Sequence, residues 1–158
     1  GAAPAGAIGL TRQSGAGARH LARELLVKAL YQWQLAGHRV AEIAAQFAAD
    51  DDFARCDRDF FAELLAVTID GAPELDVIIA RHASRGIEQL DAVGRAILLL
   101  GLAELKFRAD VPSNVVINEG VELAKRYGPA QSFKFVNAVL DKSSRELRGG
   151  AAKAGGES

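Results

Sequence analysis

Apolar positions recur at helical spacing through the first third of the chain. Leu25, Ala29 and Trp33 are four positions apart, and Ala22 and Leu26 widen this stripe. A glycine at residue 37 ends the pattern, which predicts a helix over residues 18–36. The same spacing predicts a shorter helix over residues 40–49, with its apolar side inward. A third helix is expected to start at a cap formed by Asp57 or Asp59.

The later apolar pattern predicts a central helix and two more helices after it. Residues 92–107 are apolar almost all round, so we expect a buried helix that Asp91 caps. Pro112 suits the entrance of the next helix, with Ser113 or Asn114 as its cap. We expect Gly128 to end that helix in the left-handed conformation, before a last helix that starts near residue 132. Whether residues 60–82 form one bent helix or two is left open by the segment 71–73.

These elements define the fold class. No segment alternates apolar and polar residues in the manner of a strand, and no hairpin dipeptide is flanked by strands. The chain is therefore predicted to be an all-α bundle of six or seven helices. Its domain covers residues 18–148, with subdomains of about 18–84 and 85–148 separated at the turn around Gly86. Residues 1–17 and 149–158 are rich in Gly and Ala and are expected to be flexible tails.

The amino-acid composition indicates the broad class of protein but identifies no binding partner. Of the 158 residues 49% are apolar, which permits a sizeable core, and the net charge of −1 gives no overall attraction to nucleic acid or membrane. The longest apolar run, residues 96–103, is too short to cross a bilayer. Cys56 is the only cysteine, so no disulfide forms within the chain, which fits a reducing cytoplasm. We therefore expect a cytoplasmic protein without a membrane segment.

We find no catalytic or metal-binding constellation in the sequence. The three histidines, at positions 20, 38 and 82, lie on separate elements at no ligand spacing, and the acidic run 50–52 lacks the calcium-loop pattern. Cys56 has both acidic and basic neighbours and is expected to be an inert thiol. The chain is thus predicted not to be an enzyme and to hold neither a metal nor another cofactor.

One row of side chains suggests contact with RNA. Arg19, Arg23 and Tyr31 share a helix edge at multiples of four positions, and His20 neighbours them. Guanidinium groups hold phosphates, and an aromatic face stacks on an unpaired base. The alternative is a solvated helix edge with the tyrosine half packed. For Phe135, which lies off the core side of its helix, packing against a neighbouring helix and exposure are equally open.

Two blocks of sequence resemble the NusB family. The segments 117–119 (Ile-Asn-Glu), 122–125 (Glu-Leu-Ala-Lys), 134–137 (Lys-Phe-Val-Asn) and 139–141 (Val-Leu-Asp) match its C-terminal signature. The segments 23–24 (Arg-Glu) and 29–35 (Ala-Leu-Tyr-Gln-Trp-Gln-Leu) form a second block in the right order. The resemblance covers roughly residues 19–147 and implies the all-α fold of that family.

The resemblance also implies a function. Proteins of this family pair with NusE, a small-subunit ribosomal protein, and the pair binds the single-stranded boxA element of nascent RNA. The complex joins other Nus factors on RNA polymerase to suppress termination, notably in ribosomal RNA synthesis. The family's RNA-contacting positions correspond here to Arg19, His20, Arg23, Tyr31 and Phe135, and Arg12 in the tail could add a contact. A surface for a protein partner is expected at Gly94, Arg95 and Gln131.

The sequence departs from the family in two places and leaves alternatives. Its arginine run is thinned to Arg19-His20-Leu21, and the loop before the last helix, residues 129–131, is not acidic. A helical interaction module without RNA binding is therefore one alternative. Another is the NusB-like N-terminal domain of a ribosomal RNA cytosine methyltransferase, which would require this chain to be a fragment. A homodimer through the partner surface is also left open.

Overall fold

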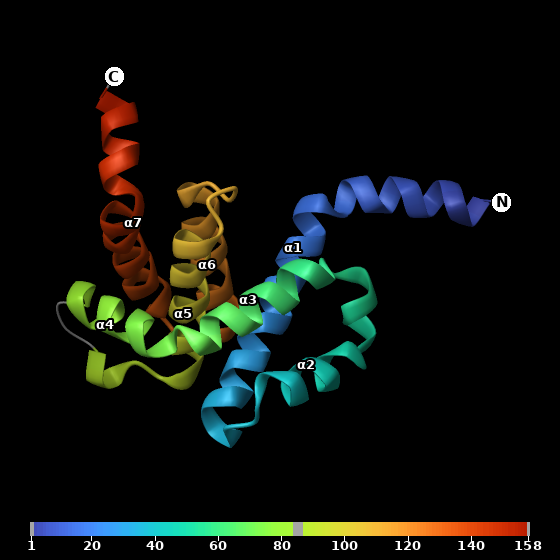
Figure 1. Cartoon of the computed structure of the whole chain (residues 1–158), viewed down its shortest axis with the longest axis horizontal. Coiled ribbons are helices and arrows are strands. Elements are labelled where there is room, and N and C mark those ends of the chain that lie inside the picture. The colour runs from blue at the N-terminus through green and yellow to red at the C-terminus, as the bar shows by residue number, and fades with distance from the viewer. Residues whose placement is uncertain (1, 84–86, 158) are drawn as a thin grey trace. The chain divides into compact units, whose positions relative to one another are not determined.

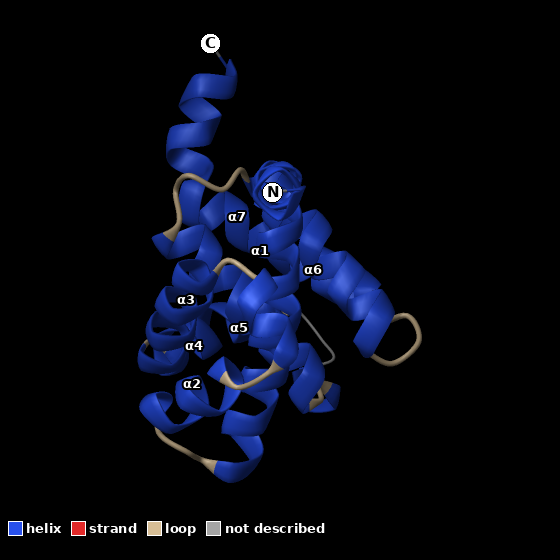
Figure 2. Ribbon diagram, turned by 90° about the vertical axis from the view of Figure 1, so that its right-hand side faces the viewer, coloured by secondary structure: helices blue, strands red, loops and turns tan. Residues whose placement is uncertain are grey.

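The computed structural model describes residues 2–83 and 87–157, and for residues 2–14, 89 and 150–157 it describes the backbone alone. Its described residues form seven α-helices and two short 3-10 helices, without a strand (Figures 1 and 2). This confirms the all-α prediction. The elements are α1 (Ala2–Ala36), α2 (Val40–Ala48), η1 (Asp51–Arg55), α3 (Arg58–Asp70), α4 (Ala72–His82), η2 (Ile87–Gln89), α5 (Ala92–Phe107), α6 (Ser113–Tyr127) and α7 (Ser132–Glu157).

The chain divides into two compact units, Gly1–Ala66 and Val67–Ser158, with the division inside α3. The sequence placed the division at Gly86, which lies outside the described residues. The predicted tails, 1–17 and 149–158, fall mainly on residues whose side chains are not described, and they stay predictions. The segment 60–82, left open by the sequence, forms two helices that meet at Gly71.

The first unit is held together by aromatic and aliphatic side chains between α1, α2, η1 and the start of α3. The ring of Phe61 lies 5.9 Å from that of Phe47 and meets the ring of Phe53 edge-on at 5.5 Å. Gly37, at φ 69°, ends α1 in the left-handed conformation that glycine favours. Asp57 caps α3, since one of its carboxylate oxygens accepts from the N–H of Phe60 at 3.0 Å, as predicted.

The second unit is built around α5, which is buried on all sides from residue 96 to residue 105. Helices α5, α6 and α7 pack on one another, and α4 packs on α5 and α7. A Cβ at Gly120 would lie 2.6 Å from a methyl carbon of Leu140, and one at Gly101 would lie 2.8 Å from the other methyl carbon. Glycine at both positions thus lets α7 approach α5 and α6 closely. Asp91 caps α5 through the N–H of Gly94 at 2.8 Å, as predicted.

The ends of α6 differ from the prediction. Pro112 itself is the N-cap, without a side-chain cap, and Ser113 is already helical. At the other end Gly128 is extended, with φ −88° and ψ 169°, because the residue before a proline avoids helical and turn conformations. The left-handed residue of this loop is Gln131, at φ 72°. The chain therefore does not use the left-handed conformation that glycine permits at position 128.

Candidate nucleic-acid interface

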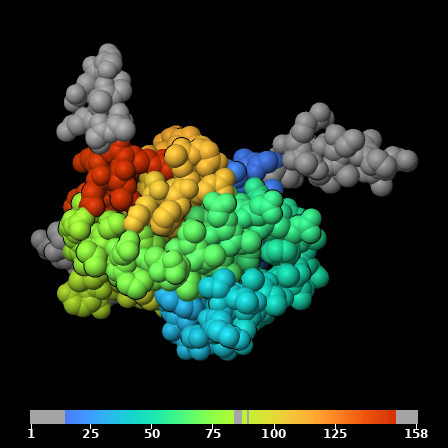
Figure 3. Space-filling model, viewed as in Figure 1, coloured from blue at the N-terminus to red at the C-terminus, as the bar shows by residue number. Residues whose placement is uncertain are grey.

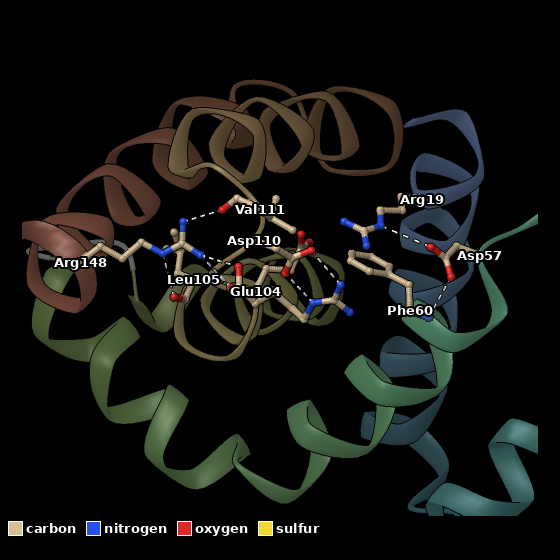
Figure 4. A network of polar contacts seen from close by, with 9 residues as sticks. Arg19, Asp57, Phe60, Glu104, Leu105, Asp110, Val111 and Arg148 are labelled. Atoms are coloured by element: carbon tan, nitrogen blue, oxygen red, sulfur yellow. Dashed lines mark hydrogen bonds and ion pairs between the residues drawn. The ribbon is translucent and has the colours of Figure 1, made fainter. Parts of the chain in front are cut away.

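Arg19 lies on α1 between a carboxylate and an aromatic ring of α3. Its Nε is 3.3 Å from Oδ2 of Asp57, and its guanidinium carbon is 4.7 Å from the centre of the Phe60 ring (Figure 4). The side chain is 31% exposed. The stacking orients the guanidinium group, and its exposed part can be reached by an anion from solvent.

Arg23 occupies a different environment from the one that its spacing suggested. Its guanidinium carbon is 5.0 Å from the centre of the same Phe60 ring, and the residue is only 3% exposed. Val27, the next position of the predicted row, is equally buried. The helix edge that these residues share is therefore not exposed along its whole length: Arg23 is buried between Arg19 and Tyr31 and packs on the same ring as Arg19, while its proposed RNA contact stays a prediction.

The exposed part of α1 carries two more of the predicted residues. His20 is 41% exposed, with Nε2 3.5 Å from a carboxylate oxygen of Glu24. Tyr31 is 40% exposed, which makes it one of the few large apolar side chains that reach the surface. The side chain of Arg12 lies outside the described residues. Arg19, His20 and Tyr31 thus give α1 a cation, an imidazole and an aromatic face toward solvent.

A cavity of about 470 Å³ adjoins Tyr31. It is lined by five residues of α1 at helical spacing and by residues of α2 and the segment after it: Lys28, Tyr31, Gln32, Leu35, Ala36, Gln46, Phe47 and Asp50. Sequence reasoning did not select Lys28, although its place three residues before Tyr31 puts both on one side of α1. The cavity itself depends on how α2 packs against α1, which no local pattern specifies.

The remaining predicted residues belong to the second unit. Phe135 is half-buried on α7, and Gln131 is exposed in the loop before that helix. Arg95 forms a two-point ion pair with Asp76, with N–O distances of 3.0 and 2.6 Å, and this hydrogen bonding raises the pKa of Arg95 above its ordinary value. Gly94 is buried beneath Leu90, so any part it has in a partner surface is through the backbone and the placement of Arg95.

Reactive and metal-binding groups are sparse in the part of the chain that is described. No three His, Cys, Asp or Glu side chains there gather closely enough to hold a metal ion. Cys56 is buried, and this burial, followed by the nearby charge of Asp57, raises the pKa of its thiol. Among the described helices, none has the length and apolar character needed to span a membrane.

The sequence is closely similar to a group of bacterial proteins. The NusB family model matches residues 20–145. The chain is 52% identical to the transcription antitermination protein NusB of Alcanivorax borkumensis, over 83% of this chain and 87% of that protein. It is 48% identical to the NusB protein of Pseudomonas savastanoi pv. phaseolicola, over 82% of this chain and 79% of that one.

Two solved structures share the fold. NusB of T. maritima superposes with a TM-score of 0.71 at 30% identity, covering 81% of this chain and 91% of that one. A crystal structure of the antitermination factors NusB and NusE in complex with double-stranded RNA contains a chain that superposes with a TM-score of 0.66 at 28% identity, covering 80% and 96%. The relatives are named for antitermination and not for a reaction, in agreement with the prediction that the chain is not an enzyme. This chain therefore belongs to the NusB family of transcription antitermination proteins.

Proposed function

We propose that this chain is an antitermination factor that binds boxA RNA together with NusE. In this role it joins the other Nus factors on RNA polymerase and supports transcription of ribosomal RNA, as a cytoplasmic protein. One observation carries the proposal: over 80% of its length the chain superposes on a protein from a complex of NusB, NusE and RNA. The curated relatives, matched over most of their own length, are named as antitermination proteins, which favours this function over a methyltransferase domain.

The exposed side of α1 supports the RNA part of this function. Arg19 offers guanidinium donors to a phosphate, while Tyr31 offers an aromatic face on which a base can stack. His20 lies next to Arg19 in sequence and is comparably exposed. Arg12 on the N-terminal side and Phe135 on α7 are further proposed contacts. Arg23 enters as a support for Arg19, because its own guanidinium group is buried.

The NusE contact is proposed to involve the start of α5 and the loop before α7. The ion pair with Asp76 fixes the guanidinium of Arg95 while leaving about a third of the side chain exposed. A fixed cation of this kind suits a carboxylate or a carbonyl group on a partner. Gln131 is exposed at a strained backbone position, and Gly94 lets the first turn of α5 pack against Leu90. A homodimer that uses the same residues is the competing assembly.

The function is tested by fluorescence anisotropy of a labelled boxA RNA titrated with the protein, with and without NusE, beside a scrambled RNA of equal length. We expect selective binding that strengthens when NusE is present. Equal binding of both RNAs in the presence of NusE would contradict the proposal. Light scattering of the free protein at the same concentrations distinguishes a monomer that recruits NusE from a homodimer whose shared surface NusE must displace.

A further inference from the structure

The cavity beside Tyr31 combines a size, an apolar floor and polar edges that suit one nucleotide. Its volume of about 470 Å³ lies in the range of roughly 300–1,000 Å³ that is usual for sites of small organic ligands. Phe47 is buried at its floor, while Tyr31 and Leu35 stand exposed at its edge. Figure 3 shows the end of α1 and α2 in cyan as one continuous surface. A docked helix would require an apolar groove several turns long, whereas this hollow is confined to the ends of two short segments.

The polar groups around this hollow include two side-chain amides that are hydrogen-bonded to each other. The side-chain amides of Gln32 and Gln46 exchange two hydrogen bonds, with N–O distances of 2.7 and 2.9 Å. Each amide has a second N–H and a second lone pair, so the pair presents donors and acceptors beyond those it uses itself. Both side chains border the cavity. Amide donors and acceptors at the rim suit the edge of a base, which also carries donors and acceptors, better than an aliphatic side chain.

The charged side chains at the two ends of the cavity orient a bound nucleotide. Lys28 is exposed at the N-terminal end of the lining face of α1 and can meet a phosphate. Asp50 lines the cavity from the segment after α2, and one of its oxygens accepts from the N–H of Asp52 at 2.8 Å, which fixes the carboxylate. A carboxylate repels phosphate and accepts from an exocyclic amino group, so the base and not the phosphate belongs at this end.

We propose that the cavity between the end of α1 and α2 binds one unpaired nucleotide of the RNA whose base carries an amino group. The base stacks on Tyr31, its edge faces Gln32, Gln46 and Asp50, and its phosphate contacts Lys28. This inference rests on the proposed RNA-binding function and deepens it. It turns Tyr31 from a general stacking platform into one wall of a site that selects adenine, cytosine or guanine over uracil.

The experiment combines a cavity-filling variant with RNA lacking one base at a time. Ala36, exposed at the rim, is changed to phenylalanine, which fills the hollow without removing a hydrogen bond. Ala45→Phe, at an exposed position of α2 outside the lining, is the matched control. Labelled boxA RNAs, each with an abasic site at a different position, are titrated against both variants and the unmodified chain in the presence of NusE.

We expect Ala36→Phe to weaken binding about five- to a hundredfold, the range of a lost base–aromatic stack, and Ala45→Phe to leave it unchanged. An abasic site at one position of the RNA should weaken its binding to the unmodified chain by a similar factor. The same abasic site should cause no further loss of binding to Ala36→Phe. At that position, replacing the native base by uracil should weaken binding to the unmodified chain, and Asp50→Asn should reduce this preference.

The outcomes separate the two proposals. If the unmodified chain binds the RNA but Ala36→Phe binds equally well, or no abasic position is coupled to it, the nucleotide site is overturned while RNA binding stands. If coupling is found but uracil is accepted as readily as the other bases, the cavity holds a base without the proposed selection by Asp50. If the unmodified chain shows no RNA binding even with NusE, the proposed function fails and the inference fails with it.

Discussion

At the scale of single residues, Arg19 serves two purposes that compete with each other. Its ion pair with Asp57 and its stacking on Phe60 tie α1 to the start of α3, yet the same guanidinium group is a proposed phosphate contact. An exposed ion pair of this kind contributes only about 0–1 kcal/mol to stability, because water screens it. A phosphate can therefore share or replace Asp57 as the partner of Arg19 at little cost to the fold.

We predict that Arg19→Ala and Arg23→Ala separate binding from folding. Arg19→Ala should weaken RNA binding and make the negative slope of log affinity against log salt shallower by about 0.7, the contribution of one phosphate in single-stranded RNA, without unfolding the protein. Arg23→Ala should instead lower the free energy of unfolding by about 1–3 kcal/mol, because it removes a buried side chain that packs on Phe60. Thermal unfolding followed by circular dichroism, beside RNA titrations, checks both. A stable Arg23→Ala protein with weakened RNA binding would show that Arg23 is a direct contact.

We also predict that Asp57→Asn strengthens RNA binding. Asparagine caps a helix as well as aspartate does, so the N–H of Phe60 keeps its acceptor and α3 keeps its start. The carboxylate that competes for Arg19 is lost, so RNA affinity should rise by about two- to fivefold at low salt, equivalent to a weak exposed ion pair. The gain should be absent when Arg19 is already alanine. An equal gain in that background would mean that Asp57 repels RNA without involving Arg19.

Sequence patterns specified the single residues whose roles are local. The caps at Asp57 and Asp91 and the end of α1 at Gly37 depend on neighbours within three or four positions, and each was predicted. The burial of Arg23 was not predicted, because it depends on packing against Phe60, which is distant in sequence. Spacing on a helix shows which side chains share an edge, but not which edge another element covers.

At the scale of elements, Arg148 on α7 joins the end of α5 to the start of α6. Its guanidinium group donates to the carbonyl oxygens of residues 104, 105, 108 and 111 and to Oγ of Ser113, at 2.6–3.2 Å (Figure 4). Three of these carbonyls belong to the last turn and C-cap of α5, where carbonyls run short of helical N–H partners, although that of Glu104 also accepts from the N–H of Arg108 and that of Arg108 from the N–H of Val111. One cation thereby satisfies the helix end and lies at the negative end of its dipole.

We expect Arg148→Ala to be among the more damaging polar substitutions in the second unit. The substitution removes the charged donor shared by four backbone carbonyls and Ser113, two of which (those of residues 104 and 108) keep a backbone donor, so the free energy of unfolding should fall by about 2–3 kcal/mol. Arg145→Ala is the matched control, since Arg145 forms only an exposed ion pair with Asp141 and should cost less than about 1 kcal/mol. Urea unfolding of both variants measures the difference. Equal, small losses would mean that water replaces the guanidinium at these carbonyls.

A second contact between helices predicts a dependence on pH. Arg81 and His82, at the end of α4, both contact Glu146 of α7, and the hydrogen bond from Arg81, then that from His82, lowers the pKa of Glu146. A carboxyl group with a lowered pKa in the folded state stabilises the fold fully above its ordinary pKa. That stabilisation is lost as the pH falls through the folded-state pKa, where Glu146 takes up a proton.

Glu146→Gln should therefore be less stable than the unmodified chain at neutral pH, and the gap should close as the pH falls through the lowered pKa of Glu146. Urea midpoints measured across this interval test the prediction, with Asp141→Asn on the same helix as the control for the loss of a carboxylate. A gap that stays constant with pH would mean that shape or packing, and not the charge of Glu146, holds the contact.

Helices were predictable as elements, whereas the contacts that join them were not. The apolar character of α5 on all sides predicted a central, buried helix, and α5 is buried as expected. The two ends of α6 were predicted wrongly: Pro112 and not Ser113 is the N-cap, and Pro129 holds Gly128 extended, because a proline restricts the residue before it. The Arg148 contacts span about forty residues of sequence, beyond the reach of any periodic pattern.

At the scale of the whole molecule, the net charge of −1 limits how RNA is held. No overall field attracts a polyanion, so attraction must come from a few local cations such as Arg19 and Lys28, with Arg12 as a further candidate. For single-stranded RNA each neutralised phosphate contributes about −0.7 to the slope of log affinity against log salt. Two or three contacts predict a slope of about −1.5 to −2 for the chain alone, measurable by titrations at several salt concentrations. A much steeper slope would require a basic surface that these residues do not form.

The position of Arg148 also bears on where this domain ends. The family model matches residues 20–145, so a fragment cut at the end of that match would stop three residues before this arginine. The last turn of α5 needs it nonetheless, and a chain trimmed to the matched region would lose the side chain that fastens three helices together. A recombinant fragment cut at residue 145 would therefore be expected to fray at the junction of α5 and α6.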